Sequence, residues 1–315
     1  MRNGIINIYK ERGYTSHDVV AKLRGILKQK KIGHTGTLDP DAEGVLPVCL
    51  GSGTKLCGLL TDRDKAYEAV LLLGQSTDTQ DISGTVLERS EAAVSEQEVR
   101  NVIESFVGPC QQIPPMYSAL KVGGRKLCDL ARAGQEVERK ARPVTIHEIR
   151  ILEMDLPRVR MSVSCSKGTY IRTLCHDIGE KLGCHGCMEA LIRTRSGQFL
   201  VKDSLRLFEV EKLRDEGRLT EAVLPVDRMF AHLPAAVLTE DGSRLGHNGN
   251  PFRKTDVEAQ PVPEGDVRVY DSRGSFIGVY AFRPEQGLYR PVKMFYQPSD
   301  QSQKEMNSRK TFMET

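Results

Sequence analysis

Apolar residues recur along this chain in two patterns, which predict a mixture of helices and strands. Spacings of three and four predict helices after Ser16, over 96–106 after Ser95, and from Ile171 to Leu182. Short apolar or alternating runs predict strands. These runs lie at 4–9, 45–50, 65–74, 144–152, 159–165 and 190–197.

A break at Pro234 predicts a linker, so residues 1–231 are expected to form one domain and 235–297 a second, β-rich one. In the second domain we expect a turn at 246–251, a hairpin from 267–270 and 276–282, and a last strand at 293–296. Residues 298–315 are polar and without pattern, which is typical of a disordered tail.

Length and composition agree with this division. The chain has 315 residues, 39% of them hydrophobic, which is enough for about two domains with buried cores. No apolar run reaches the roughly 18 residues of a membrane span, and the first residues lack a signal-peptide core. A cytoplasmic protein with no membrane partner is therefore expected.

The net charge of +3 says little, but basic residues are concentrated in two places. Residues 19–38 carry five Lys or Arg and no acidic residue. Residues 121–142 carry seven Lys or Arg against three acidic residues, with glycines at 123, 124 and 134. Such runs are often solvated faces, but both also suit the binding of a phosphate backbone, the second as a mobile, glycine-hinged segment.

Candidate chemistry centres on residues 33–46, a loop with three glycines that leads into the apolar strand at 45–50. Pro40 keeps Asp39 out of the helical region, so the Asp39 carboxylate should be presented on an ordered loop near His34. The alternative is a glycine-rich turn in which Asp39 caps its own backbone. Arg172 follows the apolar Ile171 near the core and needs an anionic partner, for which Asp39 is the expected choice.

Several other functions are disfavoured. Gly51–Lys55 lacks the glycine spacing of a phosphate-binding P-loop. A single carboxylate without a second argues against ordinary glycoside hydrolysis. Cys184 and Cys187 have metal-like spacing, but no second pair matches them, so neither a metal nor a disulfide framework is expected.

The sequence resembles the TruB-type tRNA pseudouridine synthases of bacteria over nearly its whole length, from Gly4 to about Tyr296. The resemblance rests on separate motifs in the right order, and the C-terminal module is similar to a PUA domain, an RNA-binding fold. The motifs are GHTGTLDP at 33–40, KAY at 65–67, GQSTDT at 74–79, PPMYSALK at 114–121 and SKGTYIR at 166–172.

The resemblance implies an α+β pseudouridine-synthase fold: a mixed, largely antiparallel sheet flanked by helices, with a small β-rich PUA-like domain after it. It implies isomerisation of uridine 55 in the T loop of tRNA to pseudouridine on a flipped-out base, without a cofactor. The RNA is expected to be gripped by 121–142, by the 19–38 helix and by the PUA-like module.

The resemblance also implies roles for single residues. Asp39 is the catalytic carboxylate, which attacks C1′, adds to the base or removes the 2′ proton. Tyr67 stacks on the target base, and Arg172 pairs with Asp39 and keeps it ionised. Leu191 lines the pocket. His34 and Tyr170 contact the substrate.

Two departures and two alternatives accompany the resemblance. The family often has Lys-Pro after its first strand, where this chain has Lys10 followed by Glu11. Lys10 is still expected to support Tyr67 and to be one of the substrate-binding residues. Cys184–Cys187 has no counterpart in the family pattern. The alternatives are a synthase that acts on another RNA, as the guide-RNA relatives do, and an RNA-binding or tRNA-folding protein. A monomer without an obligatory protein partner is expected.

Overall fold

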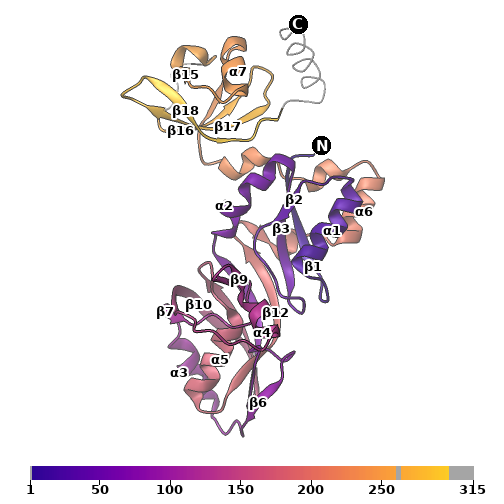
Figure 1. Ribbon diagram of the computed structural model, residues 1–315, viewed down its shortest axis with the longest axis vertical. Coiled ribbons are helices and arrows are strands. Elements are labelled where there is room, and N and C mark those ends of the chain that lie inside the picture. The colour runs from indigo at the N-terminus through magenta and orange to yellow at the C-terminus, as the bar shows by residue number, and fades with distance from the viewer. Residues whose placement is uncertain (1, 260–263, 298–315) are drawn as a thin grey trace.

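The computed structural model describes residues 2–259 and 264–297, and its larger part is built around one nine-stranded sheet (Figure 1). The main path of this sheet is β1-β3-β12-β4-β11-β10-β7, with β2 beside β3 and β13 beside β12. All pairings are antiparallel except that of β3 with β12, so the expected mixed, largely antiparallel sheet is confirmed. Its strands are β1 (Gly4–Lys10), β2 (Ile32–His34), β3 (Glu43–Leu50), β4 (Lys65–Leu73), β7 (Gly108–Gln112), β10 (Arg142–Asp155), β11 (Arg158–Cys165), β12 (Gly186–Ser196) and β13 (Phe199–Leu200).

Helices cover the two halves of this sheet separately. Helices α1 (Ser16–Leu27) and α6 (Leu207–Asp215) share an apolar core with β1 and β3. Helices α3 (Glu96–Glu104) and α5 (Ile171–Leu182) share another with β4, β10 and β11. A third core lies around the 3₁₀ helix η1 (Gly51–Leu56) and α2 (Cys57–Thr61).

Smaller elements complete this part of the chain. Among the described helices, none has both the length and the apolar character needed to cross a membrane. The remaining elements are β5 (Gln75–Thr77), β6 (Val86–Arg89), β8 (Lys121–Val122), β9 (Arg125–Lys126), α4 (Leu127–Arg132), η2 (Val201–Asp203), η3 (Leu219–Ala222) and η4 (Val226–Phe230).

The C-terminal part is a second, five-stranded sheet in the order β14-β16-β17-β18-β15, as expected of a β-rich module. It meets the larger part through Phe230, whose ring lies 5.7 Å from that of Phe295, and through a 2.8 Å hydrogen bond from the Tyr270 hydroxyl to Asp227. Its elements are β14 (Ala235–Val237), α7 (Glu240–His247), β15 (Phe252–Arg253), η5 (Lys254–Asp256), β16 (Asp266–Tyr270), β17 (Phe276–Arg283) and β18 (Leu288–Met294). The tail expected at 298–315 lies outside the described residues.

The structure corrects the N-cap expected at Ser16 for the first helix, because Ser16 is already the first residue of α1. Thr15 is the N-cap: its hydroxyl accepts from the Asp18 backbone N–H, and the Asp18 carboxylate accepts from the Thr15 N–H. Ser16 instead ties the helix to the loop around Asp39, because its hydroxyl accepts from the Leu38 N–H at 2.9 Å.

Three other boundaries differ from expectation. The polar sequence of residues 75–81 predicts a loop after the strand at 65–74, but this stretch begins with β5. The last strand begins at Leu288, five residues early, and the turn expected from 246 overlaps α7, which the apolar pattern did not predict. Gly246 packs against Leu238 and Ile277 in place of a large apolar side chain, so α7 has little apolar stripe to detect.

Close packing of α5 on β12 predicts unequal effects of adding one methyl group to two helical glycines. A Cβ on Gly179 would lie 2.1 Å from the backbone nitrogen of Gly186, whereas a Cβ on Gly25 of α1 meets nothing within 4 Å. We expect Gly179→Ala to lower the free energy of unfolding by about 1–3 kcal/mol and Gly25→Ala to raise it by up to about 1 kcal/mol. Chemical denaturation measures both, and equal effects would contradict the packing described.

Candidate active site

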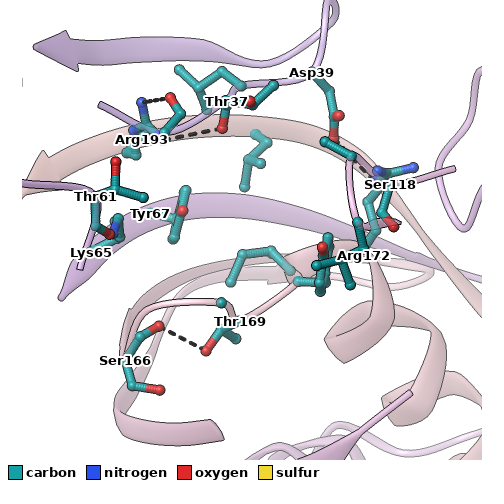
Figure 2. A pocket seen from close by; sticks show the side chains of 18 residues that line it. Thr37, Asp39, Thr61, Lys65, Tyr67, Ser118, Ser166, Thr169, Arg172 and Arg193 are labelled. Carbon is teal, nitrogen blue, oxygen red and sulfur yellow. Dashed lines mark hydrogen bonds and ion pairs between the residues drawn. The ribbon is translucent and has the colours of Figure 1, made fainter. Parts of the chain in front are cut away.

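A cavity of about 330 Å³ opens where β4 and β12 meet the loop that carries Asp39 (Figure 2). The turn from β11 into α5 and the start of the 121–142 segment close its other sides. The structure therefore brings together five chain segments that are far apart in sequence. The lining residues are Gly36–Asp39, Thr61, Lys65, Tyr67, Ser118–Leu120, Ser166, Gly168–Arg172, Leu191 and Arg193.

Asp39 and Arg172 form an ion pair in this cavity, as expected from the sequence. Arg172 Nε lies 3.1 Å from Asp39 Oδ2. The Arg172 side chain is only 6% exposed, whereas that of Asp39 is 41% exposed. The guanidinium is thus held in the protein while the carboxylate faces the open space, where a substrate can reach it.

Arg172 has a second carboxylate partner that the sequence did not indicate. Its Nη1 lies 3.5 Å from Asp81 Oδ2 and donates to the Thr79 carbonyl at 2.9 Å. Its Nη2 donates to the Tyr117 carbonyl at 2.8 Å. One guanidinium at the start of α5 therefore joins the Asp39 loop, the loop that contains Thr79 and Asp81, and the loop just before the basic 121–142 segment.

Burial raises the pKa of the Asp39 carboxyl above its ordinary value, and Arg172 only partly offsets this effect. The like charge of Asp81 raises the pKa of Asp39 further. Arg172 does favour the ionised form of Asp39, as expected, but burial has the larger effect. In the folded protein Asp39 therefore binds a proton more readily than an ordinary aspartate does.

The loop that presents Asp39 is held from beneath by two buried cations. Lys10, at the end of β1, is fully buried and donates to the carbonyls of Glu11, Pro40 and Ala42. Arg193 of β12 donates to the carbonyls of Val45, Gly36 and Thr37 at 2.7, 3.4 and 3.4 Å. These bonds hold the loop on both sides of Asp39. Within residues 2–259 and 264–297, the Asp39 carboxylate has no backbone hydrogen-bond partner.

This geometry changes the role expected for Lys10. The Lys10 side chain has no exposed surface and donates to three carbonyls around the loop, so it supports the backbone near Asp39. Among the described residues it makes no hydrogen bond to Tyr67. Burial lowers the pKa of Lys10 to about 8. Lys10 therefore positions the loop, and its side chain has no exposed surface to offer to a substrate.

Tyr67 and Leu191 come from the paired strands β4 and β12 and form the apolar wall of the cavity. Burial raises the pKa of the Tyr67 hydroxyl to about 12, although Arg193, directly across the strand pair, donates a hydrogen bond to it. Tyr170 lines the opposite side, and its backbone N–H donates to the Gln112 side chain at 2.9 Å. His34 lies on β2 and is not among the residues that line the cavity.

The residues that sequence reasoning missed are Lys65, Asp81, Ser118 and Arg193. An alternation signal pointed to two of them, since Lys65 and Arg193 each lie two residues from an expected pocket residue, Tyr67 and Leu191 respectively. Ser118 lies in the motif at 114–121 but was given no role of its own, and no local pattern pointed to Asp81. In the described ranges the acidic, His and Cys side chains form no group able to hold a metal, and Cys184 and Cys187 are buried free thiols.

The fold and the cavity together define the class of protein. A chain of the Cbf5-Nop10-Gar1 complex superimposes with a TM-score of 0.67 and 26% identity, over 93% of this chain and 85% of that one. A chain of the archaeal box H/ACA sRNP Nop10-Cbf5 complex gives 0.66 and 26%, over 95% and 87%. The architecture is thus that of a pseudouridine synthase, and the motifs around Asp39, Tyr67 and Arg172 meet in its cavity.

Sequence comparison identifies the family. Residues 24–171 match the TruB family pseudouridylate synthase N-terminal domain, and 172–231 match the tRNA pseudouridylate synthase B C-terminal domain. The tRNA pseudouridine synthase B of Lachnoclostridium phytofermentans is 52% identical over 93% of this chain and 99% of its own length. That of Bacillus licheniformis is 43% identical over 96% and 100%. The chain belongs to the TruB family of pseudouridylate synthases, which are isomerases.

The shared ion pair predicts a loss of stability when Arg172 is replaced. Arg172→Met leaves Asp39 and the mostly buried Asp81 without their cation, so we expect the free energy of unfolding to fall by about 2–4 kcal/mol. Arg158→Met is the matched control, because it breaks the more exposed pair with Glu189 and should cost much less stability than Arg172→Met. Urea denaturation separates the two, and equal losses would show that the Arg172 network does not stabilise the fold.

Proposed function

We propose that this chain converts uridine 55 in the T loop of tRNA to pseudouridine, with Asp39 as the catalytic carboxylate. The observation that carries the proposal is the Asp39–Arg172 pair, which faces Tyr67 and Leu191 across one cavity. A base inside a folded RNA can reach such a site only after it leaves its stack. The cavity offers it an aromatic face, an apolar wall and one accessible carboxylate.

The reaction exchanges one bond to the sugar for another. The C1′–N1 bond breaks, the uracil turns, C5 bonds to C1′, and the proton lost from C5 is balanced by one gained at N1. No oxidant, reductant or cofactor is consumed. Attack on C1′, addition to the base and removal of the 2′ proton all require Asp39 in its ionised form, which the Arg172 guanidinium favours.

Other residues receive the substrate in this proposal. Tyr67 stacks on the target base, Leu191 packs against it, and Tyr170 and His34 contact the RNA around it. His34 has this role only if the RNA covers β2 beside the cavity, since His34 lies outside the lining. None of these four residues carries a carboxylate that could replace Asp39. Burial lowers the pKa of His34, which favours its uncharged form.

The RNA backbone is held outside the cavity. Residues 121–142 form a hairpin, β8 and β9, followed by α4, and adjoin the cavity through Ser118, Ala119 and Leu120. With seven cations against three acids this segment closes on the tRNA phosphates. The basic 19–38 stretch adds further contacts with the RNA from within the catalytic domain, residues 1–231. A separate PUA-like RNA-binding domain, residues 235–297, adds others.

The comparisons favour tRNA over another RNA. Relatives named tRNA pseudouridine synthase B share 40–52% of their residues with this chain, whereas the Cbf5 complexes share about 26%. We therefore propose an enzyme that works as a monomer in the cytoplasm, without an obligatory protein partner.

Replacement of the carboxylate tests the function directly. Asp39→Asn keeps the shape of the side chain but removes its charge, so pseudouridine formation should be lost, while tRNA affinity should stay within about threefold because phosphate contacts dominate binding. Single-turnover conversion of an unmodified tRNA transcript, mapped to the nucleotide, measures the first effect, and filter binding measures the second. Conversion at position 55 by the variant at the wild-type rate would remove Asp39 from the mechanism.

The raised pKa of Asp39 predicts the acid side of the pH profile. Protonation removes the active form, so the single-turnover rate should rise with pH through a midpoint above 3.8, the ordinary value for this group. Asp81→Asn removes the like charge that raises the pKa, so it should move the midpoint to lower pH. Circular dichroism at each pH shows that the protein is folded, and an unchanged midpoint in the variant would contradict the coupling.

A further inference from the structure

The cavity has a second charged end that the roles above do not use. Figure 2 shows Lys65 and Arg193 at one end, beside Tyr67, while Asp39 and Arg172 lie at the other. Lys65 begins β4, and Arg193 lies in the neighbouring strand β12, directly across from Tyr67. The β4–β12 pairing thus brings two cations to the same wall as the aromatic ring.

Both cations are buried, Lys65 to 7% exposure and Arg193 to 1%, and both donate to uncharged backbone carbonyls. Lys65 Nζ donates to the Thr61 and Arg63 carbonyls, which leaves one of its three N–H groups free. Arg193 donates to three loop carbonyls and to the Tyr67 hydroxyl. Within residues 2–259 and 264–297, neither cation forms an ion pair with a carboxylate, whereas Arg172 in the same cavity has two.

Two like charges in one buried wall oppose each other. The pKa of Lys65 is lowered to about 8, mainly by burial and then by Arg193. The other groups that face it are Cys165 of β11, whose pKa burial raises to about 11, and Asp62 and Asp64 of the preceding loop, which favour the charged form only weakly. Such a wall is unfavourable while it is empty and becomes favourable when an anion enters.

We propose that Lys65 and Arg193 stabilise the negative charge that develops on the uracil ring when its bond to the sugar breaks. This inference rests on the proposed function. The electron pair of the C1′–N1 bond goes to N1 and spreads to the O2 and O4 carbonyls, which accept hydrogen bonds from the two cations. When C5 then bonds to C1′, the C5 proton leaves, N1 gains a proton, and the ring becomes neutral again.

The depth of the two cations favours the base over a phosphate as the source of the charge. A backbone phosphate remains attached to the sugar outside and keeps its water, whereas the base is the part that enters an apolar cavity. Tyr67, which the base would contact, stays neutral near pH 7, so it does not neutralise the cations in advance. The base becomes negatively charged only as its bond to the sugar breaks. A preorganised cation that binds this charge in the transition state therefore lowers the barrier.

Lys65 is the better of the two to test, because Arg193 also holds the loop of Asp39. We expect Lys65→Met to lower the single-turnover rate of pseudouridine formation by about 100-fold, with tRNA affinity within about threefold of wild type. Lys65→Arg should recover at least a tenth of the wild-type rate. Lys212→Met, on the exposed face of α6, is the matched control and should behave as wild type.

A transcript with 5-fluorouridine at the target position separates catalysis from a structural effect. Fluorine makes the ring a better anion, so cleavage should depend less on Lys65, and the defect of Lys65→Met should shrink at least fivefold. Consumption of the nucleoside is read by mass spectrometry of digested RNA. Equal defects on both transcripts would mean that Lys65 is only structural and overturn the proposal. A defect confined to affinity would assign the site to a phosphate and overturn it equally.

The alkaline side of the pH profile gives an independent readout. The wild-type rate should fall as pH rises through about 8, where Lys65 loses its proton, and Lys65→Arg should move this fall to higher pH. The same fall in both proteins would overturn the proposal. Product formation by wild type at a rate matched by Lys65→Met overturns this inference alone, whereas no product from wild type overturns the proposed function and this inference with it.

Discussion

The active site depends on the Arg172 guanidinium, which holds together three segments that share no regular structure. It pairs with Asp39, reaches Asp81, and donates to the carbonyls of Thr79 and Tyr117. Its own position is set by α5, whose first turn is buried against the central sheet. A guanidinium this deeply buried is stable only when all of its partners are in place. The position of the Asp39 carboxylate is therefore coupled to that of the loop at Tyr117, which borders the cavity.

The loop of Asp39 shows the same principle from the opposite side. Lys10 and Arg193 donate hydrogen bonds to its backbone carbonyls, so the loop is anchored on both sides of Asp39 although it has three glycines. Gly44 allows the backbone of Arg193 to lie close to the end of this loop, because a Cβ on residue 44 would lie 2.3 Å from the Arg193 carbonyl oxygen. Its φ of +103° also suits glycine. A carboxylate whose support is fixed before the substrate arrives needs little reorganisation during the reaction.

The sequence predicted much of this arrangement, and its failures have physical causes. The strands and the Asp39–Arg172 pair were predictable because burial imposes a period, and because a cation beside the core needs an anion. Asp81 was not predictable, since it lies 42 residues from Asp39 and only the folded loop brings both to Arg172. Lys10 was assigned to the substrate because spacing cannot show that its charge is covered by carbonyls. Helix α7 was missed because it packs through small residues.

The distribution of charge in the cavity follows from the way the strands pair. Inward positions of β4 alternate as Lys65, Tyr67 and Ala69, and Leu191 and Arg193 lie across from them on β12. Apolar contact is thus placed between the cationic end and the Asp39–Arg172 end. In the proposed function the uracil ring lies between the two ends, with its sugar toward the carboxylate and its carbonyl oxygens toward the cations. A ring that turns within this frame exchanges N1 for C5 near the sugar while its charge stays close to the same wall, so one rigid pocket can serve both the cleavage and the rejoining.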